Sequence, residues 1–124
     1  MTNLNIAPTK TTPQIEFNAA TGDLEISGQS YPESAVDFYQ PVMTWLAEFL
    51  KGETSLTLGF KLSYFNTSSS KCILNILRLL EKANAEGKKV EVNWHHNEAD
   101  EQMQETGEEF AENMKLTFNV VAFK

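Results

Sequence analysis

Residues 56–83 read LTLGFKLSYFNTSSSKCILNILRLLEKA, and this stretch predicts a strand, a short turn and a helix. From Leu56 to Tyr64 every second residue is large and apolar, which is typical of a strand with one buried face. From Cys72 onward the apolar residues recur three or four positions apart, as in a helix that buries one side. Four consecutive hydroxyl residues, 67–70, separate the two patterns.

The hydroxyl run admits two interpretations. Ser, Thr and Asn side chains accept hydrogen bonds from the free N–H groups that begin a helix, so the run can be a plain N-terminal cap. The same N–H groups and the helix dipole favour negative charge, so a phosphate on one of these hydroxyls would also be stabilised. A cap is the commoner role for such residues, but one side chain is enough for a cap and this turn has four hydroxyls.

Alternating apolar residues predict four further strands, in residues 15–17, 24–26, 90–94 and 115–123. A turn containing Gly22 joins the first two as a hairpin. Helical patterns fill residues 34–50 and 98–113, and Pro41 is expected to kink or divide the first of them. Residues 1–12 are predicted to be an irregular or extended arm, and residues 28–33 a loop.

These patterns predict a single α/β domain over residues 1–124, with two layers and a mixed five-stranded sheet. All five strands alternate instead of being apolar throughout, so the helices are expected mainly on one face. The last three strands are separated by helices and should therefore be parallel. In this arrangement the hydroxyl run lies at the carboxyl end of a strand, where open α/β sheets place their functional sites.

Composition narrows the class of protein. The sequence has 124 residues, 41% apolar and 22% charged, which is typical of one globular domain. Its single cysteine, Cys72, excludes an internal disulfide, and its place on an apolar helix face predicts a packing role. No secretory signal and no apolar run of membrane-spanning length is visible, so we expect a cytoplasmic protein without a membrane segment.

The net charge of −7 is concentrated in one segment. Residues 97–114 contain seven acids and no Lys or Arg, whereas the rest of the chain has ten acids and ten bases. Nucleic acids and anionic membranes are bound through basic patches, so neither is an expected partner. The acidic segment is expected to be the solvated face of a helix, and a docking face for a basic partner stays open.

The sequence offers little for catalysis. His95 and His96 are adjacent on a predicted strand and should point to opposite faces, so they are not expected to share a metal ion. Ser68 and His95 leave open a small hydrolase, but no GxSxG motif or oxyanion-forming glycines accompany them. We therefore expect a protein that is not an enzyme and has no cofactor.

Four motifs spread over almost the whole chain carry a resemblance to a known family. They are Gly28-Gln29-Ser30-Tyr31-Pro32-Glu33, Tyr64-Phe65-Asn66-Thr67-Ser68-Ser69-Ser70-Lys71, Val90-x-Val92-x-Trp94 and Met103-x-x-x-Gly107-Glu108-Glu109. In this combination the chain resembles the SiaC family of bacterial regulatory phosphoproteins. The Asn-Thr-Ser-Ser turn is the most specific of the four motifs.

The resemblance implies a phosphorylation switch in a partner-switching pathway. Its phosphoacceptor would be Thr67, modified by a dedicated Ser/Thr protein kinase and restored by a PP2C-type phosphatase. The unphosphorylated form would bind and activate a diguanylate cyclase, raising cyclic di-GMP and promoting biofilm growth. The residues expected at the partner-binding surface are Tyr31, Tyr64, Asn66, Ser68, Ser69, Ser70 and Lys71.

The resemblance also implies a fold similar to that of the STAS-domain anti-sigma-factor antagonists, in which a phosphorylated serine begins a helix after a strand. An antagonist that sequesters an anti-sigma factor is therefore the alternative function within regulation.

Overall fold

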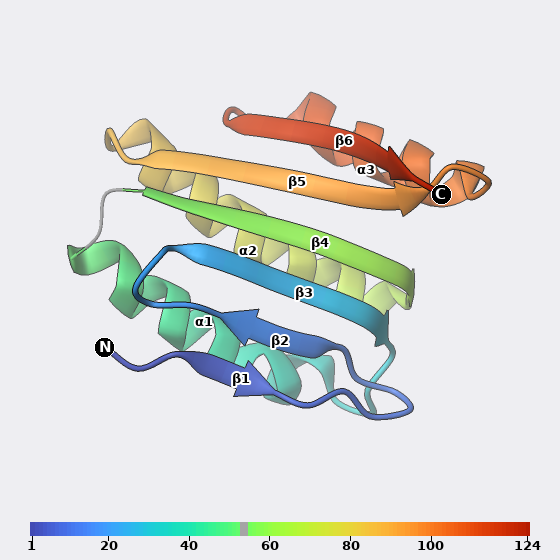
Figure 1. Ribbon diagram of the computed structural model, residues 1–124, viewed down its shortest axis with the longest axis horizontal. Coiled ribbons are helices and arrows are strands. Elements are labelled where there is room, and N and C mark those ends of the chain that lie inside the picture. Colours follow the sequence, from blue (N-terminus) through green and yellow to red (C-terminus); the bar gives the residue numbers. More distant parts are fainter. Residues whose placement is uncertain (53–54) are drawn as a thin grey trace.

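The computed structural model describes residues 1–52 and 55–124, which form six strands and three helices (Figure 1). In chain order the elements are β1 (Leu4–Ile6), β2 (Gln14–Phe17), β3 (Asp23–Ser30), α1 (Ala35–Gly52), β4 (Ser55–Phe65), α2 (Thr67–Ala85), β5 (Lys89–Asn97), α3 (Glu101–Asn113) and β6 (Thr117–Phe123). The strands lie in the sheet in the same order as in the chain. Strands β1, β2 and β3 pair antiparallel, and β3 to β6 pair parallel.

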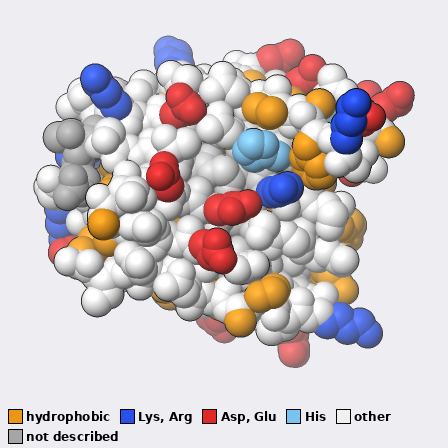
Figure 2. All heavy atoms as spheres, viewed as in Figure 1, with side chains coloured by type: hydrophobic (Ala, Val, Ile, Leu, Met, Phe, Trp, Pro, Cys, Tyr) orange, Lys and Arg blue, Asp and Glu red, His pale blue; other side chains and the backbone are white. Residues whose placement is uncertain are grey.

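All three helices cover the same face of the sheet, as the alternating strands predicted (Figure 1). The core lies between the two layers, and its largest side chains with less than 2% exposure are Trp94, Tyr39, Phe17, Phe60, Ile15, Ile26, Leu46, Leu58, Ile73, Ile76, Leu77 and Leu80. The opposite face is open and polar, with acidic side chains near its centre (Figure 2). On it the Asn119 side chain donates to Asn93 at 2.9 Å, and Asn93 donates to Glu91 at 3.1 Å.

The prediction of five strands was wrong, because residues 4–6 add a sixth. Leu4 pairs with Phe17 and Ile6 with Ile15, and the side chains of Leu4 and Ile6 pack against the core. A strand of three residues is too short to show a clear period-2 pattern, so residues 4–6 could not be recognised as a strand from the sequence. The predicted loop at residues 28–33 was also partly wrong, since β3 continues to Ser30.

Helix α1 runs from Ala35 to Gly52 as one element with Pro41 inside it, so it is not divided into two helices. Gly52 is its last residue. Pro41 is exposed, on the side of α1 that faces away from the core.

A register shift between Gly28 and Gln29 changes the end of β4. Gly28 pairs with Leu62, but Gln29 pairs with Tyr64, so β4 has one extra residue at this point. Period 2 from Leu56 would bury Tyr64. In the structure Tyr64 is 50% exposed, whereas the next residue, Phe65, packs against the core. The bulge therefore turns an aromatic side chain out to solvent immediately before α2.

Trp94 on β5 occupies the centre of an aromatic cluster. Its ring lies 5.2 Å from Phe60, 5.9 Å from Phe65 and 5.4 Å from Phe110, measured between ring centroids. Its Nε1 donates a hydrogen bond to the Met103 carbonyl in α3 at 3.1 Å. The backbone of α3 comes so close that a Cβ on Gly107 would lie 2.4 Å from Trp94 Cδ1. Gly107 is thus what allows α3 to approach the sheet.

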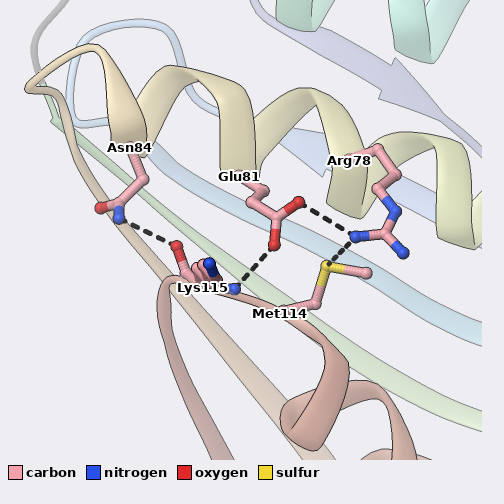
Figure 3. Close-up of polar contacts among 5 residues, drawn as sticks. All are labelled: Arg78, Glu81, Asn84, Met114 and Lys115. Carbon is pink, nitrogen blue, oxygen red and sulfur yellow. Dashed lines mark hydrogen bonds and ion pairs between the residues drawn. The ribbon is translucent and has the colours of Figure 1, made fainter.

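Helix α2 holds the turn between α3 and β6 through polar contacts (Figure 3). The Glu81 carboxylate accepts a hydrogen bond from the backbone N–H of Lys115 at 2.7 Å and another from the Arg78 guanidinium at 3.0 Å. The Asn84 side chain donates to the Lys115 carbonyl at 3.1 Å. The Lys115 N–H and the Arg78 guanidinium lower the pKa of Glu81 below its ordinary value.

We expect Gly107→Ala to lower the free energy of unfolding by about 1–3 kcal/mol, the usual cost of overpacking a core. Alanine favours a helix, but Trp94 is 1% exposed and enclosed by other rings, so the clash outweighs that gain. The matched control is Gly52→Ala, where the added Cβ meets nothing within 4 Å. Urea unfolding of the three proteins measures both effects. Equal stability of wild type and Gly107→Ala would contradict the close approach.

Glu81→Gln is expected to reduce stability at neutral pH and to make little difference in acid. The pKa of Glu81 is lower in the folded chain than in the unfolded one, so its ionised carboxylate stabilises the fold. This contribution to the free energy of unfolding is complete above the unfolded pKa of about 4.3. It is lost as the pH falls through the folded pKa. Melting temperatures of wild type and variant should therefore converge below about pH 4. Glu48→Gln is the control, because Glu48 is 62% exposed and its ion pair is with the exposed Lys51. A constant difference at every pH would contradict this assignment.

Candidate functional site

The first turn of α2 begins at the carboxyl end of β4 and is capped by Asn66. The Asn66 side-chain oxygen accepts the backbone N–H of Ser69 at 2.9 Å, and its carbonyl accepts the N–H of Ser70 at 2.9 Å. Among the described residues, the N–H groups of Thr67 and Ser68 make no hydrogen bond. The cap is thus supplied by the asparagine, and the hydroxyl run is left for other roles.

The four hydroxyl residues of this turn have different environments. Thr67 and Ser68 are exposed, Ser70 is half-buried, and Ser69 is fully buried. A kinase must reach the hydroxyl that it modifies, so Thr67 and Ser68 are accessible acceptors in this conformation and Ser69 is not. The burial of Ser69 separates it from the predicted partner-binding surface.

Ser69 belongs to a buried chain of three hydroxyl groups. Ser30 Oγ donates to Ser69 Oγ at 2.8 Å, and Ser30 Oγ lies 2.7 Å from the Tyr39 hydroxyl. All three residues are at most 1% exposed. Ser30 has one hydroxyl proton and donates it to Ser69, so Tyr39 is the donor in the hydrogen bond with Ser30. The Ser30 carbonyl also accepts the N–H of Asn66 at 3.1 Å, so the end of β3 holds this turn at two points.

Tyr39 is held as a donor by its surroundings. Burial raises the pKa of its phenol to about 12, an effect that the hydrogen bond with Ser30 only partly offsets. The hydroxyl therefore stays protonated at any physiological pH. The chain joins three elements: Ser30 ends β3, Tyr39 lies in α1 and Ser69 lies in α2.

The other predicted surface residues surround Thr67. Tyr64 is half exposed and makes an edge-on contact with Tyr31, with ring centroids 5.7 Å apart. Lys71 is exposed one helical turn after Thr67, on the same side of α2. Asn66 is half-buried by its capping role. The structure thus places Tyr31, Tyr64, Thr67, Ser68 and Lys71 at one end of the sheet.

An uncharged groove between α1 and α2 adjoins this end and was not predicted from the sequence. It has a volume of about 290 Å³ and is lined by Val36, Tyr39, Gln40, Met43, Cys72 and Asn75. Val36 is apolar and yet 69% exposed beside this groove. Cys72 is buried as expected, and burial raises the pKa of its thiol.

The two histidines point to opposite faces of β5, as predicted. His96 is 4% exposed on the helix side, and its Nδ1 lies 2.9 Å from the Asn97 carbonyl. His95 faces the open side of the sheet and lines a hollow of about 570 Å³. Its Nε2 lies over Gly59 of β4, 3.7 Å from the position that a Cβ on this glycine would take. Ser68 is the second residue of α2, on the opposite face of the sheet. The hydrolase pairing of Ser68 with His95 was therefore wrong.

Charged groups elsewhere have structural roles. In the part of the chain that the structure describes, no three His, Cys, Asp or Glu side chains are grouped so as to hold a metal ion. Asp100 caps α3 by accepting the N–H of Met103 at 3.0 Å, while Glu101, Glu105, Glu108, Glu109 and Glu112 are exposed along α3.

None of the helices within residues 1–52 and 55–124 is long and apolar enough to span a membrane.

Comparisons with known proteins agree on one family. A model of the SiaC family of regulatory phosphoproteins matches residues 6–123. An uncharacterized protein of Pseudomonas aeruginosa strain UCBPP-PA14 is 37% identical over 123 residues, which are 98% of each chain. The crystal structure of apo-SiaC from Pseudomonas aeruginosa has a TM-score of 0.92 at 36% identity and covers 98% of this chain and 100% of its own.

A further similar structure contains a partner. It is the crystal structure of the diguanylate cyclase SiaD in complex with its activator SiaC, from Pseudomonas aeruginosa. The matched chain has a TM-score of 0.93 and 36% identity, and the match covers 97% of this chain and 99% of that one. The expected similarity to STAS domains stays a prediction.

The buried hydroxyl chain predicts an alkaline titration that Tyr39→Phe removes. The folded pKa of Tyr39, about 12, is above its ordinary value of 10.0. The stabilisation from this group is complete below about pH 10 and is lost as the pH rises towards the folded pKa. Ultraviolet absorbance should show one tyrosine ionising near pH 12 in the wild type and not in the variant. If Tyr39→Phe removed a tyrosinate signal near pH 10 and left the signal near pH 12, the assignment would be contradicted.

Proposed function

The chain belongs to the SiaC family of regulatory phosphoproteins, and we propose that it is a switch protein that binds and activates a diguanylate cyclase while Thr67 is unphosphorylated. The observation that carries the proposal is the placement of Thr67. It is the first residue of α2, it is exposed, and it follows the exposed Tyr64 by three residues. Similarity to the SiaC chain of a cyclase complex supports the choice of partner.

Phosphorylation of Thr67 would change the charge of this surface without requiring a change of fold. A phosphate adds about −1.5 to −2 charges at pH 7. The free N–H groups of Thr67 and Ser68, the helix dipole and the nearby Lys71 ammonium all favour that charge. The modified chain is therefore expected to remain folded.

The same phosphate would exclude a partner that covers Thr67. Thr67, Ser68 and Tyr64 are uncharged, so a partner can bury them without removing water from a full charge. A partner shaped for this neutral surface would have to dehydrate a dianion after phosphorylation, with no opposite charge of its own to replace the water. Binding would then be lost through the cost of desolvation.

A Ser/Thr protein kinase and a PP2C-type phosphatase complete the proposed cycle, since the chain needs enzymes to add and remove the phosphate. We propose that the chain itself is not an enzyme, and the separation of Ser68 from His95 supports this. The alternative of an anti-sigma-factor antagonist is not favoured by any specific observation, because the similar structures are of SiaC, alone or with a cyclase.

We expect Thr67→Glu to weaken cyclase binding at least about tenfold, which corresponds to 1.4 kcal/mol, and Thr67→Ala to keep most of the affinity. A carboxylate imitates the charge of the phosphate, whereas alanine leaves the surface neutral. The matched control is Thr21→Glu, which adds the same charge at an exposed position at the opposite end of the parallel strands. Titration calorimetry with the purified cyclase measures all four affinities. Equal affinity of Thr67→Glu and Thr21→Glu would refute the switch.

The proposed modification is tested by phosphopeptide mapping of the protein purified from its own host, with and without the PP2C-type phosphatase. One phosphate on Thr67 that accumulates in the strain without phosphatase is the expected result. Thr67 without phosphate in both strains would leave Asn66 and its neighbours as a plain helix cap. In that case the role of the surface would have to be found by other means.

A further inference from the structure

We propose that Ser30 and Tyr39 determine which hydroxyl of the 67–70 run is phosphorylated, by holding Ser69 inward and so turning Thr67 outward. This inference rests on the proposed phosphorylation of Thr67 and concerns its specificity. A kinase that meets four consecutive hydroxyl residues needs a reason to choose one. In this chain the choice is made by buried side chains that the kinase does not touch.

The geometry of a helix links the two positions. Successive residues are about 100° apart around the axis, so Thr67 and Ser69 lie about 200° apart, on opposite sides of α2. Ser68 and Ser70 lie about 100° from Ser69, towards the flanks of the helix. A contact that fixes Ser69 inward therefore makes Thr67 the hydroxyl that points most directly to solvent. The observed exposures agree with this, since Ser69 is 0% exposed and Thr67 is exposed.

The contact that fixes Ser69 comes from outside the helix. The Asn66 cap satisfies the Ser69 N–H, but the Ser69 hydroxyl is bound by Ser30 at the end of β3. Ser30 is in turn held by the Tyr39 hydroxyl from α1. An unpaired hydroxyl in this fully buried place is unfavourable, so any rotation of the turn that breaks the chain is opposed. The three hydroxyls thus set the rotation of the first turn.

The chain also explains why Ser69 is not an acceptor. Its oxygen is buried and occupied, and a phosphate there would place a dianion among Ser30, Tyr39 and the core without a counter-charge. Ser68 remains accessible, so it is the competitor of Thr67. The ratio of phosphate on Thr67 to phosphate on Ser68 is therefore the quantity that the hydroxyl chain should control.

The experiment measures this ratio by quantitative phosphopeptide mapping of chains purified from the host strain without the PP2C-type phosphatase. Ser30→Ala and Tyr39→Phe should each lower the ratio roughly three- to tenfold, the range expected for the loss of one hydrogen bond. Ser63→Ala is the matched control, because it removes an exposed hydrogen bond of 3.3 Å from Ser63 in β4 to the Gly28 carbonyl in β3, two residues before Ser30. Its ratio should equal that of the wild type.

A second pair of variants lies within the run itself. Ser69→Ala removes the held hydroxyl, whereas Ser70→Ala removes a half-buried neighbour, and both keep Thr67 and Ser68 intact. We expect the ratio to fall in Ser69→Ala alone. A loss of stability without a role in selection would lower the melting temperature and leave the ratio unchanged. Tyr39→Phe keeps the ring in the core, so it tests the hydroxyl even if Ser30→Ala does not fold.

Two outcomes would overturn the inference in distinguishable ways. If Thr67 carries the phosphate and the ratio is the same in Tyr39→Phe and Ser69→Ala as in their controls, the hydroxyl chain has no part in selection and the proposed function stands. If no phosphate is found in the run of the wild-type chain, the inference and the proposed function fall together.

Discussion

Burial of the sheet from one side only is the constraint on which the rest of the structure depends. Three helices cover six strands on a single face, and α2 lies between the other two (Figure 1). Its inner side is fully enclosed, with Ile73, Ile76, Leu77 and Leu80 all 0% exposed. The first turn of α2 therefore meets solvent on one side only, at the carboxyl end of β4. The candidate surface is that exposed side, extended by the tyrosines that precede α1 and α2.

Helices α3 and α2 contact the rest of the fold in different ways. At α3 the backbone of Gly107 packs directly on the indole of Trp94, and the Met103 carbonyl accepts the indole N–H. At the site, α2 is held by polar contacts from Ser30 and Asn66 in addition to its apolar side. Hydrogen bonds are directional, whereas apolar contacts tolerate small rotations. The polar attachment is thus suited to a place where the direction of one side chain matters.

Much of the fold could be predicted from the sequence, because five of the six strands and all three helices show recurring apolar residues. Strand β1 has only three residues, so its pattern is invisible until its partner β2 is known. The outward turn of Tyr64 depends on a bulge against β3, and no pattern within β4 reveals the register of a neighbour. At the site, the four hydroxyls look alike in the sequence. What distinguishes Ser69 is a partner 39 residues earlier in the chain, and the choice of Thr67 came from the resemblance to a family.

The strands lie in the sheet in the order in which the ribosome makes them. Each new strand finds its neighbour already synthesised at the open edge, so the sheet can be extended one strand at a time from the amino terminus. No strand has to be inserted between two that are already paired. The turn at Thr67 emerges after β3 and α1, which supply Ser30 and Tyr39, and before α3 and β6. Its buried partners are therefore synthesised before it, and the last strand is added at the far edge of the sheet, away from them.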